Sequence, residues 1–183
     1  PIQRRSSSYS SNSRFSIRTN ARINHSVAAE IHEPARGIKM LALDVDGVLS
    51  DGKLYYGNDG EELKCFSILD GLGIKLLQDQ GIIVAIITGR ESNIVSRRAR
   101  ELAIQHVVQG REDKITALNE LLKTTGLTLE QTAYMGDALP DLSAIIQCRI
   151  GTTVANGHDF VKQTAVWVSS PCVAARPLRH LAD

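Results

Sequence analysis

Two aspartates one residue apart, Asp44 and Asp46, have the clearest capacity for chemistry in this sequence. They directly follow an apolar run, Met40 to Leu43, which is typical of a strand buried on both faces. Side chains alternate along a strand, so both carboxylates point to one side and Val45 points to the other. Because two neighbouring carboxylates repel each other, we expect a divalent cation beside them. Asp44 would then attack a phosphorus atom, and Asp46 would pass a proton to and from the oxygens.

Two other interpretations apply to the same residues. Asp46-Gly47 is a common turn pair, so a plain surface turn is one of them, although the apolar run in front favours a buried strand. The other is a calcium loop, which needs oxygen ligands at its first, third and fifth positions and glycine at its sixth. Counted from Asp44, the fifth position is Val48 and the glycine comes fourth, so the sequence excludes such a loop.

Three further segments have polar residues just beyond a predicted strand. Parallel strands joined by right-handed crossovers bring their carboxyl ends to one edge of a sheet, so we expect these residues to meet Asp44 and Asp46 there. Helices are predicted at 92–102 and from 114 to about 123, between the strands. The polar residues are Thr88, Gly89 and Arg90 after the strand 81–87, Lys114 after the strand 106–108, and Asp137 with Asp141 after the strand 133–135.

Each of these side chains has an ordinary explanation beside the functional one. Thr88 would cap the following helix, or it would bind phosphate oxygens together with nearby backbone N–H groups. Lysines usually lie at the surface, but Lys114 at a strand end would neutralise a phosphate and the attacking carboxylate together. Asp137 is expected as a metal ligand. Asp141 is expected only as support, in the first turn of a helix, where an acid also suits the helix dipole.

Between the first strand and the first helix, two short extended runs at 53–56 and 62–66 flank a Gly/Asn/Asp turn at 57–60. This pattern predicts a β-hairpin. The hairpin would project from the loop after the catalytic strand, where a lid or an oligomer contact would lie. The helix that follows is expected to have Asp70 as its N-cap and to close at Gly81.

Length and composition fit one domain with a full core, because 43% of the 183 residues are apolar and no run approaches the ~20 apolar residues of a membrane span. Three widely spaced cysteines form neither a zinc pattern nor a disulfide framework, which favours a reducing compartment. The net charge of +1 is uneven: residues 1–39 hold seven basic and two acidic side chains, and the remainder hold 14 and 18. An acidic globular part suits a site that recruits a cation and argues against nucleic-acid binding.

The N-terminal segment differs from the rest, since residues 1–29 contain five arginines, many serines and no acid. Such a segment buries too little apolar surface to offset its chain entropy. We therefore interpret residues 1–37 as a disordered or loosely ordered tail in front of a domain at 38–183. An organelle transit peptide has the same composition as a flexible tail, and a nucleic-acid contact by the tail is a third interpretation.

Taken together, the motifs resemble those of the haloacid-dehalogenase superfamily of phosphatases. They are Asp44-Val-Asp-Gly-Val-Leu-Ser-Asp51, Thr88-Gly-Arg90, Lys114, and Gly136-Asp137 with Asp141. Within that superfamily, residues 38–168 resemble the 3-deoxy-D-manno-octulosonate 8-phosphate (KDO 8-P) phosphatases. The segments that carry this closer likeness are Tyr56-Gly-Asn-Asp-Gly-Glu-Glu-Leu-Lys64, Asp70-Gly-Leu-Gly-Ile74, Ala85-Ile-Ile-Thr-Gly-Arg90, and Gln109-Gly with Asp113-Lys114.

The resemblance implies an α/β fold, with a Rossmann-like parallel sheet flanked by helices and the hairpin at 53–66 in place of a cap domain. It implies Mg²⁺ bound by Asp44, the backbone carbonyl of Asp46 and Asp137, with an aspartyl-phosphate on Asp44. It also implies a homotetramer whose neighbouring subunits complete the site, in the cytoplasm of a bacterium, with no nucleic-acid or membrane partner. The residues expected to bind the phosphate or the sugar are Thr88, Gly89, Arg90, Lys114, Lys64 and Asp70.

Three departures from the family pattern leave alternatives open. Ala138 stands where the family has a second aspartate, and Leu69 stands where it has an arginine. The stretch from Ser170 to His180 replaces a glycine-rich segment and a helical tail, so the C-terminus is interpreted as altered or truncated. The leading expectation is release of phosphate from KDO 8-P. A nonulosonate 9-phosphate, such as that of sialic acid, is the alternative substrate, and a weakly active or non-catalytic tetramerisation module is the alternative function.

Overall fold

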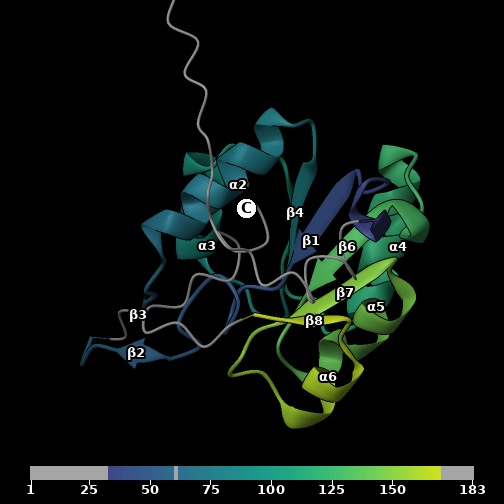
Figure 1. Ribbon diagram of the computed structural model, residues 1–183. Helices are drawn as coiled ribbons and strands as arrows, with labels where there is room; N and C mark the ends of the chain where they lie inside the picture. Colours follow the sequence, from purple (N-terminus) through teal and green to yellow (C-terminus); the bar gives the residue numbers. More distant parts are fainter. Residues whose placement is uncertain (1–32, 60–61, 170–183) are drawn as a thin grey trace, which may run out of the picture.

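The computed structural model describes residues 33–59 and 62–169 as a layered α/β protein (Figure 1). Its strands are β1 (Met40–Leu43), β2 (Tyr55–Tyr56), β3 (Glu62–Leu63), β4 (Ile83–Ile87), β5 (His106–Val108), β6 (Thr132–Met135), β7 (Ile150–Thr153) and β8 (Trp167–Val168). Its helices are α2 (Ile68–Asp79), α3 (Asn93–Glu101), α4 (Lys114–Thr125), α5 (Leu142–Gln147) and α6 (Asp159–Thr164), with short 3₁₀ turns η1 (Leu129–Gln131) and η2 (Leu139–Asp141).

The six-stranded parallel sheet has the order β5-β4-β1-β6-β7-β8, and every residue of its central strand β1 is buried. Alternation along β1 sends Leu41 and Leu43 into one apolar cluster and Met40 and Ala42 into another. Helices α2 and α3 cover the first face, while α4, α5 and α6 cover the second (Figure 1). Because both faces are covered, the strand reads as a continuous apolar run.

The strand order changes direction at β1, which has β4 and β5 on one side and β6, β7 and β8 on the other. Open α/β sheets bind ligands at such a point, outside the carboxyl ends of the strands. Leu43 at the end of β1 pairs with Ile86 in β4 and with Met135 in β6, so these three strands end almost level. The chain segments that follow them therefore meet above one edge of the sheet.

The strands predicted at 40–43, 81–87, 106–108 and 133–135 are confirmed, with small differences at their ends. Asp70 is not the N-cap of α2, so that prediction is wrong. The helix begins one turn earlier because the Ser67 side chain caps it, accepting the N–H of Asp70 at 3.3 Å. Asp141 lies, as predicted, in the first helical turn after β6, which is the 3₁₀ turn η2 that leads directly into α5.

The predicted hairpin is confirmed as the antiparallel pair β2 and β3, which stands apart from the sheet at the lower left of Figure 1. Its side chains Tyr55, Tyr56 and Leu63 are exposed. Within the described residues, no helix is long and apolar enough to cross a membrane. The expectations for residues 1–29 and for the C-terminus from Ser170 concern parts of the chain outside the described residues, and the domain boundary at residue 38 stays a prediction.

Candidate active site

Asp44 and Lys114 contact each other at the centre of the sheet edge. Asp44 directly follows β1, and Lys114 is the first residue of α4. The Lys114 Nζ atom lies 2.7 Å from Asp44 Oδ1 and donates a second hydrogen bond of 2.9 Å to the carbonyl of Ile87. Lys114 is 3% exposed and Asp44 is 7% exposed. The ammonium is therefore fixed against the carboxylate in a site with little water, as a phosphoryl-transfer centre requires.

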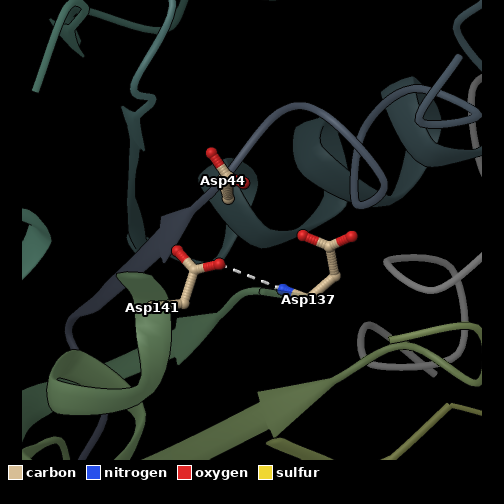
Figure 2. Close-up of side chains that lie close together, drawn as sticks. All are labelled: Asp44, Asp137 and Asp141. Atoms are coloured by element: carbon tan, nitrogen blue, oxygen red, sulfur yellow. Dashed lines mark hydrogen bonds between the residues drawn. The ribbon is translucent and has the colours of Figure 1, made fainter. Parts of the chain in front are cut away.

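Three carboxylates, those of Asp44, Asp137 and Asp141, converge beside this ion pair (Figure 2). One oxygen atom from each lies within 4.8 Å of the others. Burial, and then the charge of Asp141, raises the pKa of Asp44 to about 6, although Lys114 opposes the rise. Burial, and then the charge of Asp44, raises the pKa of Asp137 to about 7. Both shifts come from burial beside other carboxylates, and oxygen ligands of this kind suit a hard divalent cation.

Asp141 differs from the other two carboxylates because hydrogen-bond donors already surround it. Its Oδ1 accepts the hydroxyl of Tyr134 at 2.7 Å and lies 3.5 Å from Lys114 Nζ. Its Oδ2 accepts the backbone N–H groups of Asp137 at 3.2 Å, drawn as the dashed line in Figure 2, and of Ala138 at 3.1 Å. The supporting role expected for Asp141 agrees with these contacts, since the carboxylate joins the loop of Asp137 to Lys114.

A second group of charged side chains lies on the outer side of the site. The Lys64 Nζ atom is 2.6 Å from Asp46 Oδ1 and 3.3 Å from Glu62 Oε1, and the Lys64 side chain is 1% exposed. Arg90 approaches both acids, with Nε 3.9 Å from Asp46 Oδ2 and Nη2 3.8 Å from Glu62 Oε1. The Arg90 guanidinium also donates a hydrogen bond of 3.4 Å to the Tyr56 hydroxyl. The hairpin thus brings Lys64 directly to the predicted acid–base residue.

Thr88 and Gly89 form the wall of the site beyond β4. Thr88 is buried, and its N–H donates to the carbonyl of Val108 at 2.9 Å, which holds the loop against β5. It does not cap α3, because the N-cap of that helix is Ser92. A Cβ atom at Gly89 would lie 2.5 Å from Oε1 of Glu112, the end of an exposed side chain that can move aside.

Asp70 is the third residue of α2. It is 2% exposed and lines a small cavity together with Val45 and Arg98, on the face of the sheet covered by α2 and α3. The remaining predicted residues fall into two neighbouring groups. The inner group is Asp44, Lys114, Asp137 and Asp141, and the outer group is Asp46, Lys64 and Arg90.

Sequence reasoning missed Tyr134, Glu62 and Tyr56 as parts of the site. Tyr134 is fully buried within β6, where its pKa is raised well above the ordinary value by burial and by Asp141. A tyrosine in an otherwise apolar strand was a usable signal, because a buried tyrosine hydroxyl usually needs a hydrogen-bond partner. Glu62 and Tyr56 belong to the exposed-looking hairpin, and no local pattern distinguishes them from surface residues.

Chemically, the site combines an attacking group, fixed positive charge, a cation position and an acid–base group. The Asp44 carboxylate is the attacking group, Lys114 supplies fixed positive charge, and Asp44 with Asp137 offers oxygen ligands to a cation. Asp46 lies two residues from Asp44 and is held by Lys64. This set can transfer a phosphoryl group to a carboxylate and then to water.

Comparisons with known proteins agree with this chemistry. A family model described as haloacid dehalogenase-like hydrolase matches residues 104–171. The 3-deoxy-D-manno-octulosonate 8-phosphate phosphatase of Yersinia pestis is 44% identical to this chain over 157 residues, which cover 86% of this chain and 84% of that protein.

Solved structures extend the likeness to three dimensions. The crystal structure of 3-deoxy-D-manno-octulosonate 8-phosphate phosphatase from Moraxella catarrhalis, in complex with a magnesium ion, a phosphate ion and KDO, has a TM-score of 0.81 and 44% identity, covering 84% of this chain and 88% of that one. The cobalt-bound deoxy-D-mannose-octulosonate 8-phosphate phosphatase from Haemophilus influenzae has a TM-score of 0.78 and 41% identity, covering 82% of this chain and 88% of that one. Each likeness spans more than four fifths of both chains, so it concerns the domain as a whole and not one motif.

Proposed function

The chain belongs to the 3-deoxy-D-manno-octulosonate 8-phosphate phosphatases, a family of haloacid dehalogenase-like hydrolases, and we propose that it hydrolyses KDO 8-P to KDO and phosphate. It is accordingly a phosphoric monoester hydrolase. The observation that carries the proposal is the buried contact of 2.7 Å between Asp44 and Lys114, with the Asp137 carboxylate beside it. That arrangement serves attack on a phosphorus atom, and a non-catalytic assembly module would have no use for it.

The cofactor is Mg²⁺, and the residues of the site fit it. Mg²⁺ prefers oxygen ligands and uses few carboxylates. Asp44, the backbone carbonyl of Asp46 and Asp137 would hold the ion, and it would offset the burial and the neighbouring negative charge that raise the pKa of both side chains. When bound, the ion neutralises these carboxylates and polarises an oxygen of the phosphate.

In the proposed reaction, Asp44 attacks phosphorus and the bond to the sugar oxygen breaks, which leaves an aspartyl-phosphate. Asp46 gives a proton to the departing sugar oxygen. It then takes a proton from the water that attacks the aspartyl-phosphate, which releases phosphate and restores Asp44. Lys114 and the hydroxyl of Thr88 would face the phosphate oxygens as fixed donors, and this would lower the energy of the charged transition state.

The remaining substrate contacts are proposed from the outer group of charges. Lys64 and Arg90 lie beside Asp46, which gives its proton to the leaving sugar oxygen, so they would contact the sugar and not the phosphate. Gly89 would offer its backbone N–H to the phosphate. Asp70, which lines the cavity beside Val45, is proposed as a further substrate contact.

We further propose that copies of the chain join through the hairpin and α2 into a homotetramer. An isolated two-stranded hairpin is only marginally stable in water and needs packing from another element. The hairpin here exposes Leu54, Tyr55, Tyr56 and Leu63, while α2 exposes Ile68, Leu72 and Leu76. The name of the Yersinia pestis relative supports a small-molecule sugar phosphate as substrate, and a cytoplasmic location without nucleic-acid or membrane partners is part of the same proposal.

A phosphate-release assay tests the proposal. With Mg²⁺ and KDO 8-P, we expect Asp44→Asn to lower kcat by at least about 1,000-fold, because the attacking oxygen is replaced by an amide. Asp79→Asn is the matched control, since Asp79 is an exposed residue at the end of α2. Equal rates for the wild type and Asp44→Asn would contradict the proposal. A higher kcat/KM for a nonulosonate 9-phosphate than for KDO 8-P would assign the enzyme to the alternative substrate.

A further inference from the structure

Tyr134 lies in β6, and its side chain reaches Asp141 from within the sheet face that α4 and α5 cover. Residues in β6 alternate between the two faces of the sheet, and Tyr134 packs in the cluster formed with α4 and α5. These two helices begin at Lys114 and just after Asp141, so the phenol ring points toward the place where both charged residues lie. Tyr134 is 0% exposed, and its hydroxyl donates to Asp141 Oδ1 at 2.7 Å.

The two oxygens of the Asp141 carboxylate accept hydrogen bonds from different parts of the site. Oδ2 accepts the backbone N–H groups of Asp137 and Ala138 and thereby fixes the loop that carries Asp137. Oδ1 accepts the Tyr134 hydroxyl and lies at the longer distance of 3.5 Å from Lys114 Nζ. Rotation of the carboxylate would break both amide contacts, and the Tyr134 hydrogen bond is the shortest contact that opposes this rotation.

We propose that Tyr134 is a positioning residue of the metal centre, because its hydroxyl fixes the Asp141 carboxylate and, through it, the Asp137 loop. The proposal rests on the proposed function only in that the site binds Mg²⁺. Tyr134 itself touches neither substrate nor metal. The Ala138 position makes this indirect support more important, since alanine offers no side-chain oxygen to brace the same loop.

The variant Tyr134→Phe removes the hydroxyl and keeps the ring that fills the core. Partners that hold metal ligands in place typically change metal affinity by about 10–100-fold when they are removed. We expect the dissociation constant for Mg²⁺, measured by isothermal titration calorimetry on the full chain, to rise about 10-fold. In the presence of saturating Mg²⁺, the KM for the sugar phosphate should change little, because Tyr134 does not contact it.

The matched control is Thr132→Val on the same strand. Thr132 is also fully buried, and its hydroxyl donates to the carbonyl of Thr128 at 2.8 Å, far from the carboxylates. This change likewise removes one buried hydrogen bond, so it should lower the Tm while leaving Mg²⁺ affinity as in the wild type. If Thr132→Val weakened Mg²⁺ binding as much as Tyr134→Phe, the effect would be one of general stability and the proposal would be rejected.

A double variant tests whether the effect passes through Asp141. Interacting residues give non-additive changes, whereas independent ones add. Adding Tyr134→Phe to Asp141→Asn should therefore weaken Mg²⁺ binding no further than Asp141→Asn alone. Wild-type affinity in Tyr134→Phe, or full additivity in the double variant, would overturn the inference. Since calorimetry with MgCl₂ needs no turnover, a wild type that binds Mg²⁺ but releases no phosphate would remove the proposed function and leave this inference standing.

Discussion

Asp44 and Lys114 are nearly excluded from water, and each depends on the other's charge. A buried ion pair of this kind contributes little net stability, but removal of one partner leaves an unpaired buried charge, which is costly. Lys114 also donates to the carbonyl of Ile87, so its ammonium cannot follow a carboxylate that moves. At the scale of single residues, the site therefore has its charges fixed in advance of substrate binding, which is the condition for electrostatic catalysis.

The pH dependence of the metal-free protein follows from the raised pKa values of Asp44, about 6, and Asp137, about 7. A raised pKa means that the folded state binds the proton more tightly than the unfolded state. The stability contributed by these groups is therefore complete below the ordinary aspartate pKa of 3.8 and is lost as the pH rises through 6 to 7. Mg²⁺ binding requires the ionised carboxylates, so the ion reverses this loss.

We expect the increase in Tm caused by excess Mg²⁺ over EDTA to be larger at about pH 7.5 than at about pH 5, because fewer protons compete with the ion. Differential scanning fluorimetry at the two pH values measures this. Asp137→Asn is the control, since it lacks the group with the higher pKa, and its Mg²⁺ effect should be small at both pH values. A Mg²⁺ effect in the wild type that is the same at both pH values would contradict this explanation.

Site residues at the ends of apolar strands could be predicted from the sequence, whereas those within β6 and the hairpin could not. Asp44 and Asp137 each follow a buried run, and the topology of parallel sheets brings such positions together. Tyr134 contacts Asp141, which is 7 residues further along the chain, and Glu62 contacts Arg90, which is 28 residues further along. No sequence period carries that information, because it arises only when the elements pack.

Between β1 and the hairpin, the chain must turn sharply beside the metal position. Gly47 has a φ of 92°, and a Cβ atom built there would collide with the Asp137 carboxylate. The loop after β1 and the loop after β6 are thus in direct contact through a glycine. At the scale of elements, the approach of these two loops lets one ion reach ligands from both.

We expect Gly47→Ala to lower the free energy of unfolding by about 1–3 kcal/mol, the usual cost of a non-glycine residue in this backbone region. It should also weaken Mg²⁺ binding, because the new methyl group displaces Asp137. Gly81→Ala is the matched control: its φ is 81°, but nothing lies within 4 Å of the added Cβ. Urea unfolding and calorimetry should show loss of stability in both variants and loss of metal affinity in Gly47→Ala alone. Normal Mg²⁺ affinity in Gly47→Ala would contradict this account of the loop contact.

The central elements were predictable because their apolar runs are long or bounded by glycine, as in β1 and β4. The elements after α5 were not assigned from sequence. β7 reads Ile-Gly-Thr-Thr and β8 has only two residues, so neither carries a clear period. The start of α2 was misplaced because both Ser67 and Asp70 are good caps, and only the packed helix shows which one is used.

In the molecule as a whole, the covered sheet and the projecting hairpin differ in how they are stabilised. Both faces of the sheet are buried by helices, while the hairpin has two residues in each strand and exposed apolar side chains. An association of subunits through the hairpin would supply the missing packing. One chain leaves these apolar side chains exposed, and a homotetramer joined at the hairpin is expected to cover them.

We expect Leu63→Glu to weaken subunit association by at least about 10-fold, because it places a charge within an apolar contact. Leu63 is 62% exposed in the single chain, so the fold should be retained. The matched control is Ile146→Glu on α5, where the side chain is 60% exposed and distant in sequence from the hairpin. Sedimentation velocity across a range of protein concentrations should show smaller species for Leu63→Glu only. The same mass distribution for both variants would reject the hairpin as the contact.

Leu63 and Lys64 are neighbours in the chain, yet the first faces outward and the second is 1% exposed against Asp46. One peptide bond thus separates the outer surface of the molecule from the group proposed to handle protons. A compound that binds the outer face of the hairpin and tilts it would pull the Lys64 ammonium away from the Asp46 carboxylate. Because this outer face is also the proposed subunit contact, a compound that competes for the contact would act on the same chemistry, and inhibition of such an enzyme would not require a phosphate mimic in a highly charged pocket.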